Sequence, residues 1–582
     1  MLKILKKINR LMDASQKRTM AGLIVMMVIA ALLELVSVGI MIPVVQVILS
    51  PEEIAGNKWA SFLYDLFGMT DSRSFAFLML GLMMLAFVVK NVFLFIEQKA
   101  LFHFAFTNQY RTSEKLMRSY IRRDYEFFLN AETGVLQRSI TADVSNMYAL
   151  ILSVLQITTE TITSVILVIY LFTQDAVMTG TVAVLLVLTL FVIKKIIKPI
   201  MNRTGRENQD YGASMFQKIA QAIGGIKEIK VAGRENYFVN EFRRVGSGYA
   251  GAMERYQLFS TTPKLLIESV CIVGMCAYLM VLVGTDRSVD DMIPMIAAFA
   301  VAAIRLLPAA SRINNQMTSI SFNEPFFFHV SDDLVSETDA AHTDMSYAKE
   351  ATSKLPVTEE IRLEDITYRY PNSEKYIFKN AGMRIPVGAS VGVVGGSGAG
   401  KTTIIDILLG LLNLESGRVL ADGVDTAEHY REWLLNIGYI PQMIFLLDSD
   451  IRHNVAFGIP DDEIDDDRVW ECLREAQLAE FAEGLPEKLE TGIGERGIRI
   501  SGGQRQRIGI ARALYHDPEV LILDEATSAL DQDTESAIME SINRFMGRKT
   551  LIIIAHRLQT IEKCDMVYRV TDGKIVIEEK KA

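Results

Sequence analysis

The sequence predicts an α-helical domain that crosses a membrane six times, followed by a soluble α/β domain. Half of the 582 residues are apolar, a share at the upper end for soluble proteins. Six apolar segments within residues 1–325 are long enough to cross a bilayer, which takes about 20 residues per helix. Further on, the short runs 391–394 and 520–523 are entirely apolar, as expected of parallel strands buried on both faces.

The six expected spans lie at residues 20–49, 75–100, 147–173, 176–197, 262–284 and 290–316. Polar but helical segments around 100–147 and 198–262 are expected to extend these helices beyond the membrane on one side. That side is the cytosol, because Lys and Arg concentrate there, in the N-terminal arm, Arg111–Arg123 and Lys194–Arg206. The start of the chain resembles a signal peptide, but its apolar stretch is too long and has no clear cleavage site. We therefore expect a multi-pass protein of the cell (inner or plasma) membrane, with its N-terminus and its α/β domain in the cytosol.

The polar run Ser331–Lys354 has little apolar periodicity and indicates a linker. The expected organisation is a membrane domain over residues 1–325, a linker over 326–356 and the α/β domain over 357–582.

The composition argues against two classes of protein. Lys and Arg number 60 against 70 Asp and Glu, a net charge of −10, whereas a nucleic-acid-binding protein is expected to be basic. The four cysteines have neither metal-ligand spacing nor the pattern of a disulfide framework.

A glycine-rich segment of the α/β domain has the phosphate-binding pattern G-x-x-x-x-G-K-[ST]. It follows the expected strand 390–394 and precedes the expected helix 404–412, which is the context that such a loop needs. The glycines allow backbone N–H groups and a helix N-terminus to face phosphates, while Lys401 supplies positive charge and Thr402 offers a hydroxyl to Mg²⁺. The residues expected to hold the nucleotide here are Gly395, Gly396, Ser397, Gly398, Ala399, Gly400, Lys401, Thr402 and Thr403.

Two acidic residues follow the apolar run 520–523. Asp524 ends the expected buried strand, where its carboxylate can help to hold the metal. Glu525 is the candidate for orienting or activating the attacking water, and a buried structural carboxylate is the alternative. With the phosphate loop, this pair predicts an enzyme that hydrolyses a nucleoside triphosphate.

Together with the phosphate loop, the segment Ile500–Gln504 resembles the ATP-binding cassette (ABC) family, although Ile500 stands where the family usually has Leu. The resemblance implies a P-loop cassette joined to an exporter-type membrane domain, with ATP and Mg²⁺ as cofactors. Members of this family close two cassettes around ATP, and Ser528–Asp531 is similar to the loop at their contact. One chain thus carries two half-sites and is expected to form a homodimer, with a heterodimer as the alternative. The residues implied to complete the ATP site of the opposite cassette are Ser501, Gly502, Gly503 and Gln504.

The same resemblance implies further roles. Tyr370 would stack on adenine, with an edge-strand tyrosine as the alternative. Gln442 would contact Mg²⁺ and link the γ-phosphate to the membrane domain, and His556 would act as the switch histidine. Tyr125–Phe128 and Gly224–Glu235 are similar to the two regions that couple cassette and membrane domain, and ordinary helix-hairpin chemistry is the alternative.

Four basic residues in or near the expected spans are candidates for contacting cargo: Lys90, Lys264, Arg305 and Arg312. Charge at membrane depth costs about 2.5–3.5 kcal/mol on insertion scales and usually faces a cavity or a partner. Arg305 and Arg312 are seven apart and therefore share one helix face. One hypothesis is a basic cavity for an anionic head group, phosphate above all. The other is pairing with acidic residues, for which the candidates are Glu34, Glu97, Glu160 and Glu268.

An outer loop contains a short amphipathic pattern, which predicts a helix in the bilayer interface or a cap on the outer helix ends. Its apolar residues are Trp59, Phe62, Leu63, Leu66 and Phe67. With Glu34–Pro43, Arg305–Ile313 and the cassette, the chain resembles bacterial flippases for lipid-linked oligosaccharides. That likeness implies that Arg305 and Arg312 contact a cargo pyrophosphate. Lys90 and Lys264 stand where that family has arginine, and lysine lacks the bidentate fork.

The sequence therefore predicts a homodimeric ABC exporter that couples ATP hydrolysis to outward movement of an amphiphile across the lipid bilayer. A polyprenyl-pyrophosphate-linked glycan is the leading cargo, and no nucleic acid is expected as a partner. A multidrug or lipid exporter of the same architecture is the first alternative. A peptide exporter and an ATP-gated channel or regulator are less favoured.

Overall fold

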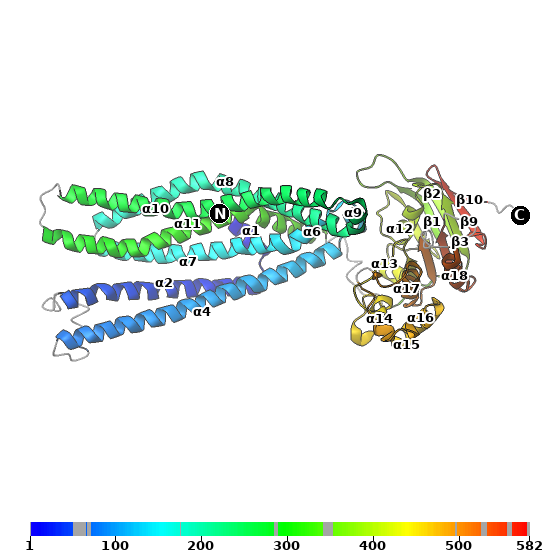
Figure 1. Cartoon of the computed structure of the whole chain (residues 1–582), viewed down its shortest axis with the longest axis horizontal. Coiled ribbons are helices and arrows are strands. Elements are labelled where there is room, and N and C mark those ends of the chain that lie inside the picture. The colour runs from blue at the N-terminus through cyan, green and yellow to red at the C-terminus, as the bar shows by residue number, and fades with distance from the viewer. Residues whose placement is uncertain are drawn as a thin grey trace. The chain divides into compact units, whose positions relative to one another are not determined.

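The computed structural model describes residues 2–49, 64, 66, 72–174, 176–283, 289–340, 353–494, 497–524, 532–555 and 561–578. The chain forms two compact units (Figure 1). Unit 1 comprises Met1–Ile121 and Ala131–Asp339, and unit 2 comprises Arg122–Asn130 and Ala340–Ala582. The short segment 122–130 thus belongs to unit 2 although unit 1 flanks it on both sides in the sequence.

Unit 1 is helical throughout its described part. Its helices are α1 (Leu2–Leu11), α2 (Ala14–Leu49), α4 (Ser72–Ile121), α6 (Thr133–Arg138), the π-helix η2 (Ser139–Asp143), α7 (Val144–Gln174), α8 (Ala176–Gly224), α9 (Ile226–Ala232), α10 (Glu235–Val283) and α11 (Val289–Ala340). Each of the six expected spans lies in one of the six long helices, except for residue 284, which is outside the described residues. Within the described part, three helical stretches are long and apolar enough to cross a membrane: Ala14–Ser37, Arg73–Ile121 and Thr133–Tyr170.

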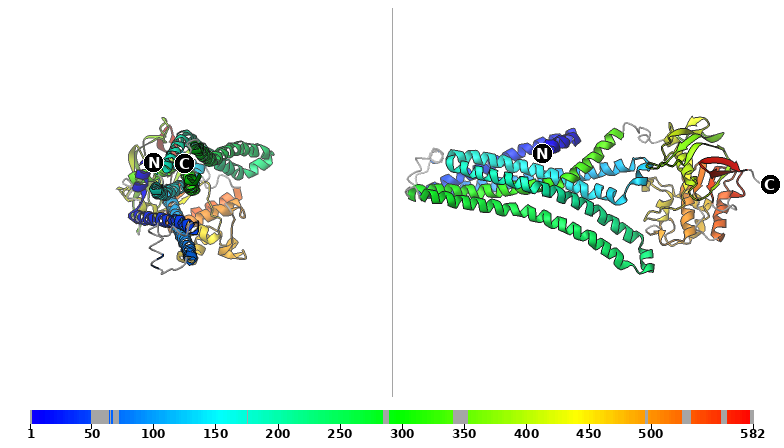
Figure 2. Two further views of the ribbon diagram at one scale, coloured as in Figure 1. Left: turned by 90° about the vertical axis from the view of Figure 1, so that its left-hand side faces the viewer. Right: turned by 90° about the horizontal axis from the view of Figure 1, so that it is seen from above.

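Two of the long helices, α8 and α10, run side by side as far as the short α9 (Figure 2). The expected extensions around 100–147 and 198–262 are largely helical. In them, α4 continues to Ile121 and α8 to Gly224. Close approach of α8 to α11 depends on a glycine, since a Cβ at Gly205 would lie 2.1 Å from the Phe322 carbonyl oxygen. Only glycine therefore fits at that crossing.

The predicted linker begins too early. Residues 326–340 belong to α11, and only the later part of the predicted range 326–356 lies beyond that helix. Phe326, Phe327 and Val330 are buried against the rest of unit 1. The apolar face of α11 therefore continues into a stretch whose sequence is rich in acidic and hydroxyl residues. The predicted linker started before this buried face because the prediction relied on the polar residues alone.

The described residues of unit 2 form two sheets. The smaller sheet has the order β2-β1-β4-β5, with bounds β1 Glu360–Tyr368, β2 Phe378–Pro386, β4 Ser416–Ala421 and β5 Val424–Asp425. The larger has the order β10-β9-β3-β8-β7-β6, with bounds β3 Ser390–Gly395, β6 Ile437–Ile440, β7 Val520–Asp524, β8 Thr550–Ile554, β9 Met566–Thr571 and β10 Lys574–Glu578. The helices are α5 Tyr125–Asn130, α12 Lys401–Leu408, α13 Tyr430–Leu434, α14 Ile451–Val455, α15 Asp466–Glu475, α16 Ala479–Glu483, α17 Gly502–Leu514 and α18 Gln532–Asn543.

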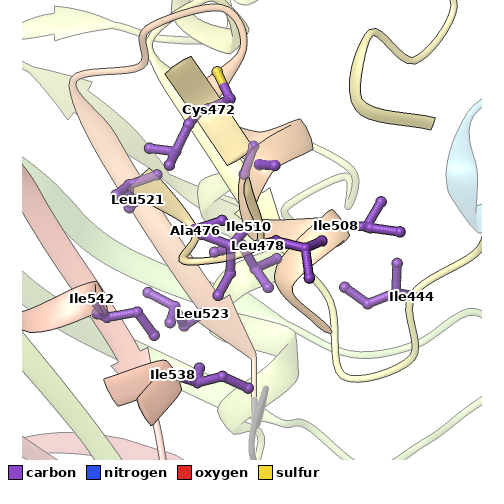
Figure 3. Packing of buried hydrophobic residues seen from close by; sticks show 14 of the residues in the cluster. Ile444, Cys472, Ala476, Leu478, Ile508, Ile510, Leu521, Leu523, Ile538 and Ile542 are labelled. Atoms are coloured by element: carbon purple, nitrogen blue, oxygen red, sulfur yellow. The ribbon is translucent and has the colours of Figure 1, made fainter. Parts of the chain in front are cut away.

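The centre of the larger sheet is parallel and almost completely apolar. Strands β3, β8, β7 and β6 are parallel neighbours, and every residue of β7 and β8 is buried. The predicted strands at 391–394 and 520–523 are therefore β3 and β7, and β8 lies between them. Figure 3 shows Leu521 and Leu523 of β7 among side chains from α15 and α17 on one side and Ile538 and Ile542 of α18 on the other. This packing fixes the carboxyl edge of the sheet, where the site lies.

Candidate functional site

The glycine-rich segment forms the expected loop between β3, which ends at Gly395, and α12, which begins at Lys401. Gly398 has φ +73° and Gly400 has φ +107°, conformations that favour glycine. A Cβ at Gly400 would also lie 2.8 Å from Cγ2 of Ile377. The loop thus turns tightly and presents the N-terminus of α12, which attracts anions.

Lys401 is folded back over this loop. Its Nζ donates hydrogen bonds to the carbonyl oxygens of Gly395 at 3.1 Å and of Gly396 at 3.2 Å. The residue is only 6% exposed. Its positive charge is therefore held at the mouth of the loop, where phosphates would meet it, rather than free in solvent.

Tyr370 lies beside the first turn of α12, two residues after β1. Its hydroxyl and Oγ1 of Thr403 are 3.0 Å apart and share a hydrogen bond. Its ring contacts the ring of Tyr368 edge-on, with centroids 5.3 Å apart. Thr403 is buried while Thr402 is exposed. Of the two threonines, Thr402 is therefore the one whose hydroxyl can reach a ligand.

The parallel strands bring further predicted residues to one edge of the sheet. Asp524 is the last residue of β7 and is 5% exposed. Gln442 follows β6, whose Ile440 pairs with Leu523 of the neighbouring β7. The helix α12 contacts both β3 and β7. The exposed Thr402 hydroxyl, the Asp524 carboxylate and the Gln442 amide oxygen are hard oxygen donors of the kind that Mg²⁺ prefers, so this donor set fits the metal.

Some predicted site residues fall outside the described part of the chain. These are Glu525, His556 and the segment Ser528–Asp531. The strands that precede Glu525 and His556, β7 and β8, are neighbours in the sheet.

A second carboxylate lies near Asp524, and the sequence pattern did not identify it. Burial, and secondly the charge of Asp524, raise the pKa of Asp406 in α12 to about 6. The nearby Tyr439 of β6 also has a raised pKa, through burial first and then through Asp524 and Asp406. The signal was present in the sequence, since Asp406 is the one acidic residue in the otherwise apolar run 404–412.

Replacing Asp406 with asparagine should stabilise the cassette above about pH 6. The pKa of this carboxyl is higher in the folded state than its ordinary value of 3.8, so the folded protein binds the proton more tightly. This contribution to stability is fully present below the unfolded pKa and is lost as the pH rises through about 6. Because Asp406 is only half-buried, we expect a gain of about 1 kcal/mol for the variant near pH 8. The check is the denaturation midpoint of the cassette within the full chain in detergent, without nucleotide or Mg²⁺, near pH 8 and near pH 4. An equal gain at both would contradict the assignment to this titration.

Ser501, the first residue of the predicted signature, is the N-cap of α17. Its Oγ accepts a hydrogen bond from the Gln504 backbone N–H at 3.2 Å, and its own N–H donates to Oε1 of Gln504 at 2.8 Å. This reciprocal pair is a capping box. It fixes the first turn of α17 while Ser501 and Gly502 stay exposed. Within one chain, Ser501 and Gln504 thus shape a helix N-terminus that is open to an anion.

The first predicted coupling region forms α5 and belongs to unit 2. The Glu126 carboxylate accepts a hydrogen bond from the Tyr368 hydroxyl at 3.0 Å and from the Asn413 backbone N–H at 3.1 Å. Burial, and then the charges of Asp406 and Tyr370, raise the pKa of the neighbouring Tyr125. This segment therefore reaches the surroundings of the phosphate loop. The second predicted region contains α9 in unit 1, which ends at Ala232 and is followed by Gly233 in the left-handed conformation.

The structure pairs two of the four candidate cargo-contacting residues with acids. Nζ of Lys90 lies 2.9 Å from Oε2 of Glu34, and both side chains are largely buried. Arg312 binds Glu160 through Nε and Nη2, at 2.5 and 3.0 Å.

The other two candidates and the predicted outer helix are less defined. The side chain of Lys264, on α10, is partly exposed. The Arg305 side chain lies outside the described part of the structure, although its backbone is part of α11. Of the predicted outer helix, only Tyr64 and Leu66 lie within the described residues.

Comparisons with known proteins match both units. Residues 378–528 match the family model described as "ABC transporter", and residues 40–304 match "ABC transporter transmembrane region". Among curated proteins, the chain is 28% identical over 455 residues to an ATP-dependent lipid A-core flippase of Cupriavidus pinatubonensis, covering 77% of this chain and 75% of the relative. It is 36% identical over 233 residues to ABC transporter B family member 21 of Arabidopsis thaliana, covering 39% of this chain and 18% of the relative.

A solved structure shows the same fold. It is a bacterial Atm1-family ABC exporter with ATP bound, with a TM-score of 0.72 and 19% identity over 97% of this chain and 95% of that one. The two family models, matched one after the other, account for the helical unit and for the phosphate-loop unit described above. The chain therefore belongs to the ABC transporter family, with an exporter-type membrane domain fused to a cassette that binds ATP and hydrolyses it to drive transport.

Proposed function

We propose that the protein is a homodimeric exporter that moves a lipid-linked oligosaccharide outward across the cell membrane, with its N-terminus and cassette in the cytosol. The observation that carries the transport function is the phosphate loop at the carboxyl edge of a parallel sheet, in a chain whose described residues include six long helices. Relatives named as lipid A-core flippases support an amphiphilic lipid as cargo.

Two observations support dimer formation: each chain has two half-sites, and large apolar residues are exposed. The N-termini of α12 and α17 can each hold phosphate, and the family's arrangement would pair α12 of one copy with α17 of the other. Large apolar side chains are also exposed on the polar stretch 198–262, where lipid would not cover them. They include Ile223, Tyr237, Val239, Phe242 and Leu258.

At each ATP site, Lys401 and the N–H groups of the loop and of α12 would hold the phosphates. Thr402, Gln442 and Asp524 would hold Mg²⁺, which when bound neutralises charge on the transferred phosphoryl group. Glu525 would orient or activate the attacking water, with His556 contacting the γ-phosphate. Tyr370 would position the adenine.

The cargo assignment is supported by Arg312. Its side chain is 55% exposed although it is paired with Glu160, so an anionic head group can reach the guanidinium. A planar guanidinium binds phosphate oxygens in a bidentate manner. A pyrophosphate-linked lipid therefore matches this residue better than a neutral amphiphile does.

A multidrug or lipid exporter of the same architecture is the second candidate. One observation favours it: Glu34 neutralises Lys90 and Glu160 neutralises Arg312, which lowers the positive charge available to an anion. In that case neutral or cationic amphiphiles, rather than a pyrophosphate lipid, would stimulate hydrolysis.

Replacing Arg312 with alanine should lower the amount of lipid flipped per ATP hydrolysed by about tenfold or more, since it removes a charge-assisted contact. The measurement uses proteoliposomes with a fluorescent lipid-linked oligosaccharide and scores its ATP-dependent movement between leaflets. Arg118→Ala is the matched control, because Arg118 makes an exposed pair with Glu114 within α4. Glu525→Gln provides the hydrolysis-deficient reference. Flipping by Arg312→Ala at the level of the control would refute the head-group assignment, and absence of flipping by the wild type would favour the second candidate.

A further inference from the structure

Glu97 is a completely buried carboxyl group in the apolar part of α4. It is 0% exposed. Thr159 Oγ1 of α7 donates a long hydrogen bond of 3.3 Å to its Oε1 and also lies 3.3 Å from the Leu155 carbonyl oxygen. Its other oxygen, Oε2, is buried without a hydrogen-bond partner among the described residues. Glu97 therefore has a single weak donor for two oxygens.

Two ion pairs are formed by charged residues of α4 and of the helices that contact it. On α2, the helix packed most extensively against α4, Glu34 binds Lys90. On α7, Glu160 follows Thr159 in the sequence and binds Arg312 of α11. Glu97 and Glu160 are close enough to interact electrostatically. In the described part of the chain, no cation lies within ion-pair distance of Glu97.

These surroundings determine the protonation state of Glu97. An isolated carboxylate in an apolar interior costs several kcal/mol even after relaxation, and such groups keep their proton instead. A neutral carboxyl group also has an O–H that can donate a hydrogen bond. A neutral Glu97 is thus a buried hydrogen-bond donor close enough to Glu160 to interact with it electrostatically.

We propose that Glu97 is a neutral hydrogen-bond donor that binds Glu160 when an anionic head group occupies Arg312. This inference rests on the proposed function, in which Arg312 contacts the cargo. A cargo phosphate on Arg312 leaves one guanidinium facing two anions and weakens its hold on Glu160. Glu160 then accepts a hydrogen bond from the Glu97 carboxyl, whose proton stays within the pair. No proton enters or leaves, and only hydrogen-bond partners are exchanged.

The exchange makes the contribution of Glu97 depend on the charge of the cargo. A neutral amphiphile leaves Arg312 bound to Glu160 and does not need the Glu97 donor. An anionic one does need it, because the released Glu160 would otherwise be an uncompensated charge at low dielectric. Loss of the donor should therefore weaken the response to anionic cargo alone.

The test compares two lipids on the full chain in lipid nanodiscs: a polyprenyl pyrophosphate and the neutral polyprenol of the same length. The variants are Glu97→Leu, which removes the donor, and Glu97→Gln, whose amide N–H replaces it. Glu114→Gln is the matched control on the same helix, because Glu114 is half-exposed and pairs with Arg118. The readout is the lipid concentration that gives half-maximal stimulation of ATP hydrolysis.

For Glu97→Leu we expect this concentration to rise about tenfold with the pyrophosphate, the size of one charge-assisted hydrogen bond, and to stay unchanged with the polyprenol. Glu97→Gln should remain within about threefold of the wild type for both lipids. Equal loss with both lipids would indicate a structural role and would overturn the proposal, as would no loss with either.

Infrared difference spectra provide a second readout that does not depend on Glu97→Leu folding. The wild type should show the carbonyl stretch of a neutral carboxylic acid, which shifts when the pyrophosphate lipid is added and is missing in Glu97→Gln. An unchanged spectrum in Glu97→Gln would overturn the proposal. Arg312→Ala separates the two claims. If this variant responds normally to pyrophosphate, the head-group site fails, whereas loss in Arg312→Ala with a normal Glu97→Leu refutes only the role of Glu97.

Discussion

Replacing Lys401 with methionine should lower the rate of ATP hydrolysis by about 10²–10³-fold, the range seen when one preorganised charge-stabilising donor is removed. Lys401 is 6% exposed, and its ammonium is already held by the carbonyl oxygens of Gly395 and Gly396. It is therefore in place before phosphate arrives and needs little reorganisation. Removing it takes away the one positive charge that the side chains of the loop contribute, so negative charge that spreads over the transferred phosphoryl group loses part of its compensation.

Methionine is chosen because it keeps most of the unbranched stem. Lys401→Ala removes the stem as well, so the two variants separate charge from packing. Steady-state hydrolysis by the full chain should fall equally in both if the charge is responsible. Lys574→Ala, on an exposed residue of β10, should match the wild type. Hydrolysis by Lys401→Met at the wild-type rate would exclude the loop as the phosphate site.

Replacing Asp143 with asparagine should lower the free energy of unfolding of unit 1 by about 2–3 kcal/mol. Leaving the buried Arg138 charge without its partner costs about 3–5 kcal/mol, but burial raises the pKa of the Asp143 carboxyl, so removing that buried carboxylate offsets part of the loss. Asp143 is 0% exposed and ends the π-helix η2. Its Oδ2 accepts hydrogen bonds at 3.2 Å from both Arg138 Nε and Gln209 Nε2, and His329 Nδ1 lies 3.3 Å away. One carboxylate thus joins η2, α8 and α11. Asparagine keeps the shape but leaves the buried Arg138 guanidinium without a counter-charge.

Thermal or denaturant unfolding in detergent measures this loss. The double variant Arg138→Gln with Asp143→Asn should recover much of it, since both charges are then absent. Glu114→Gln, in the exposed pair with Arg118, should cost at most about 0.5 kcal/mol. A single variant as stable as this control would show that the ionic character of the Asp143 cluster contributes little to stability.

Features that depend on local sequence pattern could be predicted from the sequence. The apolar lengths predicted the six long helices, and the glycine spacing predicted the loop between β3 and α12. The chain-order position of Asp524 after an apolar run was enough to place it at the edge of the sheet, because parallel strands end together. In each case a few neighbouring residues determine the backbone, so periodicity and spacing suffice.

Features that depend on which elements meet could not be predicted in the same way. The charge of Lys90 could be recognised from the sequence, but its pairing with Glu34 requires α2 and α4 to be neighbours. Asp406 was passed over because a single acid in an apolar helix looks like a solvent-facing residue until Asp524 is placed beside it. The end of α11 was missed because its buried face is formed by Phe326, Phe327 and Val330, while its polar residues dominate the composition.

The membership of segment 122–130 in unit 2 means that the polypeptide passes between the two units three times: before Arg122, after Asn130 and near Ala340. A soluble fragment that started after the last of these passages would be missing a piece of its own surface. The Tyr368 hydroxyl and the Asn413 amide would then face water where the Glu126 carboxylate now accepts their hydrogen bonds. The ATPase unit is thus not formed by the C-terminal part of the chain alone. A short segment from the middle of the helical unit completes its surface.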